Sequence, residues 1–90
     1  MLKSLKARIV GRVQGVFFRD FIKKNALKLG LKGWVRNADS DVEFFAEGSE
    51  EALKRLLQLC RLGPAGATVK KINFEWREFK GDYKSFEIIY

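Results

Sequence analysis

A stretch bracketed by glycines, residues 11–19, separates two segments with different hydrophobic periods. Before it, apolar side chains recur at every second residue, as in a strand; after it, they recur at helical spacing. The stretch therefore predicts a junction between a strand over residues 5–13 and a helix over residues 18–29. The first turn of such a helix has unpaired backbone N–H groups and attracts phosphate-like anions. Arg19, at the mouth of the helix, adds a fork of donors for two phosphate oxygens.

The rest of the chain predicts a hairpin, a second helix and two further strands. The expected strands cover residues 5–13, 31–37, 42–48 and 69–79 and a short final segment with residues 86, 88 and 90 on one side, and the expected helices cover residues 18–29 and the segment from Ser49 to Gly63. This β-α-β-β-α-β order, with an additional C-terminal strand, packs most simply as two helices on one face of an antiparallel sheet. The predicted fold is an α+β, ferredoxin-like sandwich.

Three local signals refine this outline. Ser49 is a good N-cap for the second helix, because its hydroxyl can accept a backbone hydrogen bond there. Val69 is out of phase with the alternation of its strand, which predicts a β-bulge. Cys60 lies on the apolar stripe of the second helix, so we expect it to be a small core residue and not a nucleophile.

The composition constrains the possible functions less than the loop of residues 11–19 does. The 90 residues predict a single domain, and 47% hydrophobic content is enough for a compact core. The sequence has no apolar run of membrane-spanning length and no signal-peptide pattern at its start, so we expect a cytoplasmic protein without a membrane partner. The net charge of +7 favours anionic partners, but it does not separate nucleic acid from a small phosphorylated substrate.

The sequence Ile-Val-Gly-Arg-Val-Gln-Gly-Val-Phe-Phe-Arg, residues 9–19, resembles the signature loop of the acylphosphatase family. Gly-Trp-Val-Arg-Asn at residues 33–37 resembles the second motif of that family, and residues 42–48 and 63–69 resemble its next strand and its exit from the second helix. The resemblance covers nearly the whole chain. It implies a ferredoxin-like fold and hydrolysis of acyl phosphates to a carboxylate and phosphate, with Arg19 and Asn37 as the catalytic pair.

The sequence supports a mechanism of this kind without a cofactor or a metal. It has no histidine, which removes the commonest general base and transition-metal ligand. The leaving group of an acyl phosphate is a carboxylate whose conjugate acid has a pKa of about 4, so it departs without protonation. We expect Asn37 to hold the attacking water and the loop backbone to bind the phosphoryl oxygens. The predicted phosphate-binding residues are Gln14, Gly15, Val16, Phe17, Phe18 and Arg19.

The turn after Asn37 departs from the pattern of the family. Family members usually have a glycine there, whereas residues 38–41 contain none and form a turn that is one residue shorter. A tighter turn can rotate the amide of Asn37 away from the substrate. We expect Asp39 or Ser40 to take the positive φ angle, which aspartate tolerates better than most residues.

Two other classes of function remain open. RNA-recognition domains share this order of elements and use aromatic side chains on the sheet, for which Phe44, Phe45, Phe74 and Trp76 are candidates. The carboxylates in residues 41–48 argue against a nucleic-acid partner, because they repel phosphates. A non-catalytic regulatory domain is the other alternative, since this fold has many roles. The favoured prediction is a monomeric enzyme whose partner is a small acyl phosphate.

Overall fold

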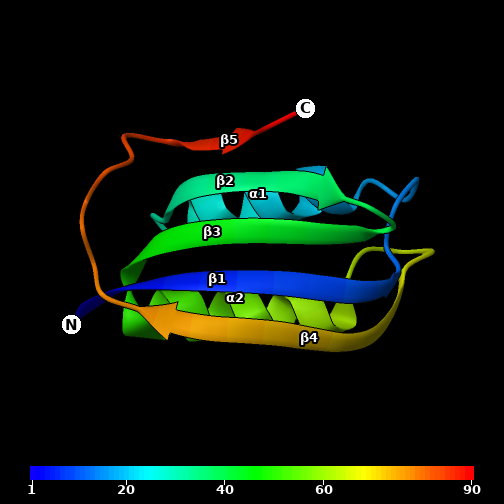
Figure 1. Ribbon diagram of the computed structural model, residues 1–90, viewed down its shortest axis with the longest axis horizontal. Helices are drawn as coiled ribbons and strands as arrows, with labels where there is room; N and C mark the ends of the chain where they lie inside the picture. The colour runs from blue at the N-terminus through cyan, green and yellow to red at the C-terminus, as the bar shows by residue number, and fades with distance from the viewer.

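The structure, a computed structural model, describes all of residues 1–90. Two helices cover one face of a five-stranded sheet and leave the other face open; in Figure 1 both helices lie behind the sheet. The elements, in chain order, are β1 (Leu2–Arg12), α1 (Phe18–Lys28), β2 (Lys32–Ala38), β3 (Asp41–Ser49), α2 (Glu50–Leu62), β4 (Thr68–Arg77) and β5 (Phe86–Ile88). The predicted ferredoxin-like order of elements is confirmed.

The strand order in the sheet is β4-β1-β3-β2-β5. β1 pairs with β3 and β4, and β2 pairs with β3, all antiparallel. β5 pairs with β2 in parallel, so the sheet is mixed and not purely antiparallel. The reason is visible in Figure 1: β4 ends at the same end of the sheet at which β2 begins, and the next segment crosses at that end before β5 runs back alongside β2. The sequence alone left the place of this strand open.

Most strand boundaries differ from the prediction by one residue, and β5 ends at Ile88, before Tyr90; β1 and β4 differ by more. β1 begins at Leu2, three residues earlier than expected, because Leu2 pairs with Ser49 of β3. β4 ends at Arg77, two residues early. Beyond it, the backbone N–H of Gly81 donates a hydrogen bond to the carboxylate of Glu47 (3.2 Å), which turns the chain away from the sheet edge.

The core lies between the sheet and the two helices. It consists of 17 buried apolar residues, contributed by the alternating side chains of the strands and by one stripe of each helix. Cys60 is completely buried in this core, and burial raises the pKa of its thiol to about 12. A thiol held in its neutral form is a poor nucleophile, so the prediction that Cys60 is a core residue is confirmed.

The two helices begin in different ways. The hydroxyl of Ser49 accepts a hydrogen bond from the N–H of Ala52 (3.1 Å), as the sequence predicts for the N-cap of α2. α1 follows Phe17, which has left-handed backbone angles and provides no side-chain cap. The first N–H groups of α1 are therefore not satisfied by a capping side chain.

The predicted bulge is present where β1 meets β4. The pairing of these strands shifts between Val10 and Gly11, so that Gly11 lies opposite Val69 and the intervening Lys70 has no partner across the pair. A Cβ atom at Gly11 would collide with the carbonyl oxygen of Thr68, which explains the glycine at this point. The bulge lies just before the loop that leads into α1.

Neither α1 nor α2 has the length and the apolar character that a membrane-spanning helix needs.

Candidate active site

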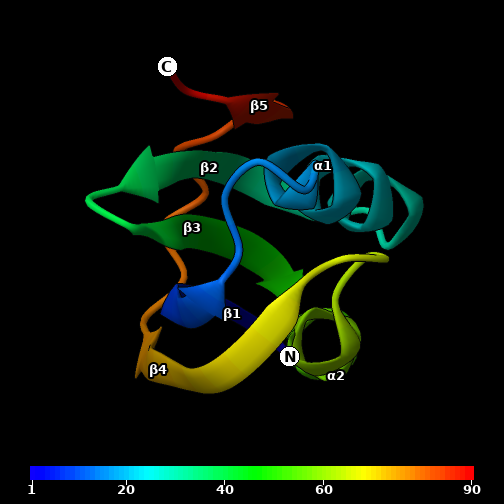
Figure 2. The ribbon, with the colours of Figure 1, turned by 90° about the vertical axis from the view of Figure 1, so that its right-hand side faces the viewer.

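A cavity of about 270 Å³ lies where the loop after β1 enters α1. Figure 2 looks at this end of the molecule and shows the loop rising from β1 to the start of α1, with the β2–β3 turn to one side. The cavity brings together Arg19 and Asn37, which come from different elements. Its lining residues are Val13, Gln14, Gly15, Phe17, Phe18, Arg19, Asp20, Asn37, Ile88 and Tyr90. Among the predicted site residues only Val16 does not line it, and its side chain lies toward Gly66 instead.

The loop presents its backbone in an unusual conformation. Gly15 has a φ angle of 74° and Phe17 one of 59°. A positive φ is uncommon for a bulky residue such as Phe17. Backbone strain of this kind is concentrated at binding and active sites, where it helps to position functional groups. Among the backbone hydrogen bonds outside the helices and strands, none uses an N–H group of residues 14–19 as its donor. These groups, beside the positive end of the α1 dipole, are suited to bind an anion.

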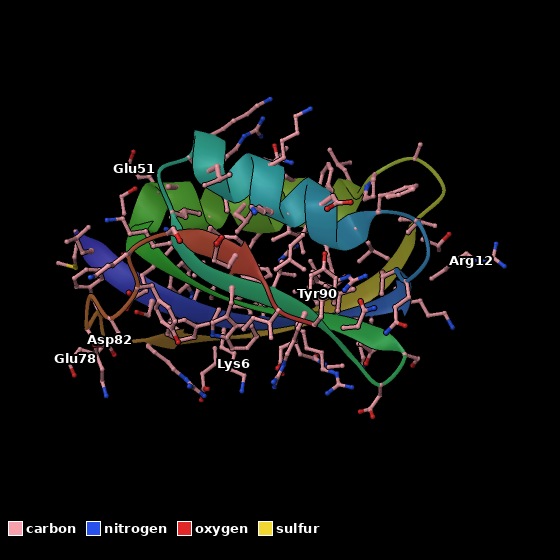
Figure 3. All side chains as sticks on the ribbon, turned by 90° about the horizontal axis from the view of Figure 1, so that it is seen from above. Lys6, Arg12, Glu51, Glu78, Asp82 and Tyr90 are labelled. Atoms are coloured by element: carbon pink, nitrogen blue, oxygen red, sulfur yellow. The ribbon has the colours of Figure 1, made fainter.

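Arg19 is held at the cavity by an aromatic ring. The guanidinium carbon of Arg19 lies 5.0 Å from the ring centre of Tyr90, within the range of a cation–π contact. Tyr90 follows β5, whose pairing with β2 carries it to this end of the sheet, as Figure 3 shows. The guanidinium of Arg19 donates no side-chain hydrogen bond or ion pair within the protein, so its N–H groups are available for a ligand.

Asn37 lies near the end of β2, paired with Val42 of β3. Its side chain is exposed and borders the cavity. Asp39, two residues later, has a φ angle of 56°, so the prediction that a residue of this turn takes the positive φ is confirmed. The turn therefore closes without a glycine.

Two side chains from β1 and the loop fasten this short turn. The side-chain N–H groups of Gln14 donate to the carbonyl oxygens of Asp39 (2.7 Å) and Asp41 (2.8 Å). The guanidinium of Arg8 donates to the carboxylates of Asp41 (2.8 Å) and Asp39 (3.1 Å) and to the carbonyl of Ala38 (3.2 Å). These hydrogen bonds, that to Asp41 above all, raise the pKa of Arg8. We call these contacts the turn clamp; they join the anion-binding loop to the hairpin that carries Asn37.

The surroundings of the cavity provide no group of three or more side chains that could hold a metal ion. Asp39 and Asp41, the two carboxylates of the nearby turn, are both paired with Arg8.

Comparison with known proteins identifies the family. The acylphosphatase family model matches residues 5–88. This chain belongs to the acylphosphatase family. It is 46% identical to the acylphosphatase of Pyrobaculum aerophilum over 90% of this chain and 87% of that protein. It is 44% identical to the acylphosphatase of Dehalococcoides mccartyi, over 99% of this chain and all of that protein. The crystal structure of acylphosphatase from Bacillus subtilis covers the whole chain at 36% identity with a TM-score of 0.94.

The site of this acylphosphatase also includes residues that sequence reasoning missed. Asp20, Ile88 and Tyr90 line the cavity, although no sequence motif assigned them a role. The alternation of the last residues placed Ile88 and Tyr90 on one side of a strand, but only the parallel pairing with β2 determines which elements that side meets. For Gln14, only the backbone was expected to take part in the site; its side chain binds the hairpin turn, which no sequence pattern predicted.

Proposed function

We propose that this acylphosphatase cleaves the carboxyl–phosphate bond of small acyl phosphates by in-line attack of a water molecule held by Asn37. The phosphoryl group is bound by the guanidinium of Arg19 and by the backbone N–H groups of residues 14–19. The observation that carries this proposal is the shared cavity, in which Arg19, Asn37 and the unpaired amides of the loop converge.

Each group has a role that suits its chemistry. The fork of Arg19 and the loop amides are fixed before the substrate arrives, so they stabilise charge on the phosphoryl oxygens without reorganisation. The amide of Asn37 can orient a water molecule but cannot accept its proton. The proton therefore passes to an oxygen of the phosphoryl group, and the acyl carboxylate leaves unprotonated. Because phosphoryl transfer is largely dissociative, positioning and charge stabilisation carry most of the catalysis.

Hydrolysis is expected to need no metal ion. In this mechanism Arg19 and the loop amides supply the charge that Mg²⁺ supplies in many phosphatases. The initial rate of benzoyl phosphate hydrolysis should therefore stay within about twofold when EDTA is added in excess. A metal-dependent phosphatase in the same buffer serves as the control for chelation. Loss of activity in EDTA that Mg²⁺ restores would contradict the metal-free mechanism.

The turn clamp is expected to keep Asn37 in place. Gln14→Glu replaces the amide donor with a carboxylate that faces the carbonyl oxygens of Asp39 and Asp41 and repels them. We expect kcat for benzoyl phosphate to fall about tenfold, because the attacking water is misplaced, and the free energy of unfolding to fall by about 1 kcal/mol.

The matched control for this test is Gln58→Glu, which makes the same chemical change on the exposed face of α2. It should leave kcat unchanged. KM in Gln14→Glu should rise as well, because Gln14 lines the cavity and the new carboxylate repels the phosphoryl group. An unchanged kcat together with a lowered stability would mean that the clamp serves only the fold.

The alternative of a nucleic-acid-binding module has less support. Phe44 is buried, and Phe74 and Trp76 pair with the core-facing Ala7 and Leu5, so their rings lie on the helix side of the sheet. Phe45 alone of the four candidates lies on the open face. Its ring packs between those of Trp34 (6.3 Å between centres) and Tyr83 (5.6 Å), and the indole N–H of Trp34 donates to the hydroxyl of Tyr83 (3.2 Å). The ring of Phe45 is therefore partly covered by its two neighbours, which leaves less of it for base stacking.

We also infer that the protein acts as a monomer in the cytoplasm, without a membrane or nucleic-acid partner. The proposed catalytic groups all come from one chain, so the mechanism needs no second copy. The only cysteine is buried and unpaired, which is compatible with a reducing compartment.

A further inference from the structure

A groove outside the active site runs between α2 and β4. It consists of two hollows of about 360 and 330 Å³ that share Arg61, and it is lined by residues 54, 57, 58 and 61 of α2 and residues 69–72, 74 and 76 of β4. We call it the α2–β4 groove. None of these residues lines the active-site cavity, so the groove is a separate feature of the surface.

The hollow toward the end of β4 offers an apolar surface. Phe74 and Trp76 line it, and 43% of Phe74 is exposed. The two residues are two positions apart on the strand, so their side chains are on the same face of the sheet. Exposed aromatic side chains that line a groove are typical contacts of a protein partner.

The hollow toward the start of β4 is strongly basic. Arg61, Lys70 and Lys71 line it, and no aspartate or glutamate lines either hollow. All three are exposed, and none is in an ion pair. Arg61 suits the negative end of the α2 dipole, but no helix dipole accounts for two lysines on a strand. Three unpaired cations around one hollow repel one another, and a ligand with carboxylates relieves this repulsion.

Beside the groove lies a free edge of the sheet. β4 pairs with β1 alone, and no strand follows it on the other side (Figure 1). At alternate residues its backbone N–H and C=O groups therefore face no strand and can pair with one more extended segment. Lysines on such an edge repel a second copy of this chain, which has a net charge of +7. The same lysines attract an acidic segment.

We propose that the α2–β4 groove is a docking site for an acidic, extended segment of another protein. The segment adds to the edge of β4 as a strand, its apolar side chains contact Phe74 and Trp76, and its carboxylates meet the basic hollow. The free backbone groups of the edge favour a peptide over a nucleic acid, whose backbone has no amides to pair with them. The inference does not depend on the proposed function, and hydrolysis continues in the complex.

The charge requirement is tested with two capped peptides in isothermal titration calorimetry. The acidic probe is Glu-Glu-Val-Thr-Val-Thr-Val-Glu-Glu, and its neutral control has glutamine in place of each glutamate. We expect the acidic peptide to bind about tenfold more tightly than the neutral one. Raising the salt concentration from about 50 to about 300 mM should weaken its binding several-fold, because the cations are exposed.

The location is tested with variants of equal net charge. The double variant Arg61→Glu and Lys70→Glu should bind the acidic peptide at least about tenfold more weakly. The matched control, Lys24→Glu and Lys28→Glu, makes the same change on exposed residues of α1 and should bind within about twofold of the wild type.

The apolar contact is tested by Phe74→Ser, which should weaken binding about fivefold. Phe79→Ser is its control, since Phe79 is also partly exposed, at 37%, and lies outside the groove. The melting temperature and the hydrolysis of benzoyl phosphate are measured for each variant, so that a general loss of structure is recognised.

Amide NMR spectra of the complex test the mode of binding. The signals of β4 and α2 should shift, and outward-facing amides of β4 should exchange more slowly with solvent when the peptide is bound. Shifts confined to other surfaces, or no added protection of β4, would overturn strand addition at this edge. Equal binding of the acidic and neutral peptides, or none by either, would overturn the acidic partner. Tighter binding of a uridine oligonucleotide that the double variant abolishes would assign the groove to nucleic acid instead.

Discussion

Replacing Arg19 with alanine is expected to lower kcat for benzoyl phosphate by about 10²- to 10³-fold, the usual cost of losing a preorganised donor at a developing charge. KM should also rise, because the guanidinium binds the phosphoryl oxygens before the reaction as well as during it. Arg19→Lys should be nearly as inactive. A lysine keeps the charge, but its single ammonium lacks the planar fork with which a guanidinium binds two oxygens at once.

The control for Arg19 is Arg61→Ala, which removes an exposed arginine from the last turn of α2. It lowers the net charge by the same amount, so it separates the local role of Arg19 from the general attraction of a basic protein for an anion. It should keep full activity. If Arg19→Ala kept a third or more of the wild-type kcat/KM while its melting temperature was unchanged, the assignment of Arg19 would be wrong.

Asn37→Ala is expected to lower kcat by about 10²-fold with only a small change in KM. The reason is that, in the proposed mechanism, Asn37 contacts the attacking water and not the phosphoryl group, so its loss affects the transition state more than substrate binding. Its side chain is exposed and outside the core, and stability should change little. Single-turnover kinetics with benzoyl phosphate would measure the chemical step directly.

Asn73→Ala is the matched control for Asn37, since Asn73 is an exposed asparagine on β4. It should be as active as the wild type. A normal kcat in Asn37→Ala would mean that another group holds the attacking water. The short turn after Asn37 would then be expected to have rotated its amide away from the substrate.

Much of the fold could be predicted from the sequence because its signals are local. The alternation before residue 11, the Ser49 cap, the irregular phase of Val69 and the tolerance of Asp39 for positive φ each depend on a few neighbouring residues. The resemblance to the acylphosphatase family pointed to Arg19 and Asn37, and the structure places both at one cavity.

The features that could not be predicted depend on contacts between distant segments. β5 has only three residues, and its pairing with β2 uses main-chain groups that every sequence has. The contact of Tyr90 with Arg19 follows from that pairing and was missed with it. The hydrogen bonds of Gln14 to the hairpin turn depend on the distance between two loops, which no local pattern reports.

The position of β1 between β3 and β4 determines how activity returns on refolding. β1 is the first element of the chain, but both strands that pair with it follow α1. The pair of Arg12 with Thr68, for example, joins residues that are far apart in the sequence. Long loops must therefore close before β1 is held on both sides, which makes folding slow, on the order of milliseconds to seconds. The loop that leads to Arg19 begins where β1 ends, and Arg8 of the turn clamp, which contacts the hairpin of Asn37, lies on β1. In the proposed mechanism, Arg19 and Asn37 act at one cavity, so hydrolytic activity should return on refolding only when the central strand is in place.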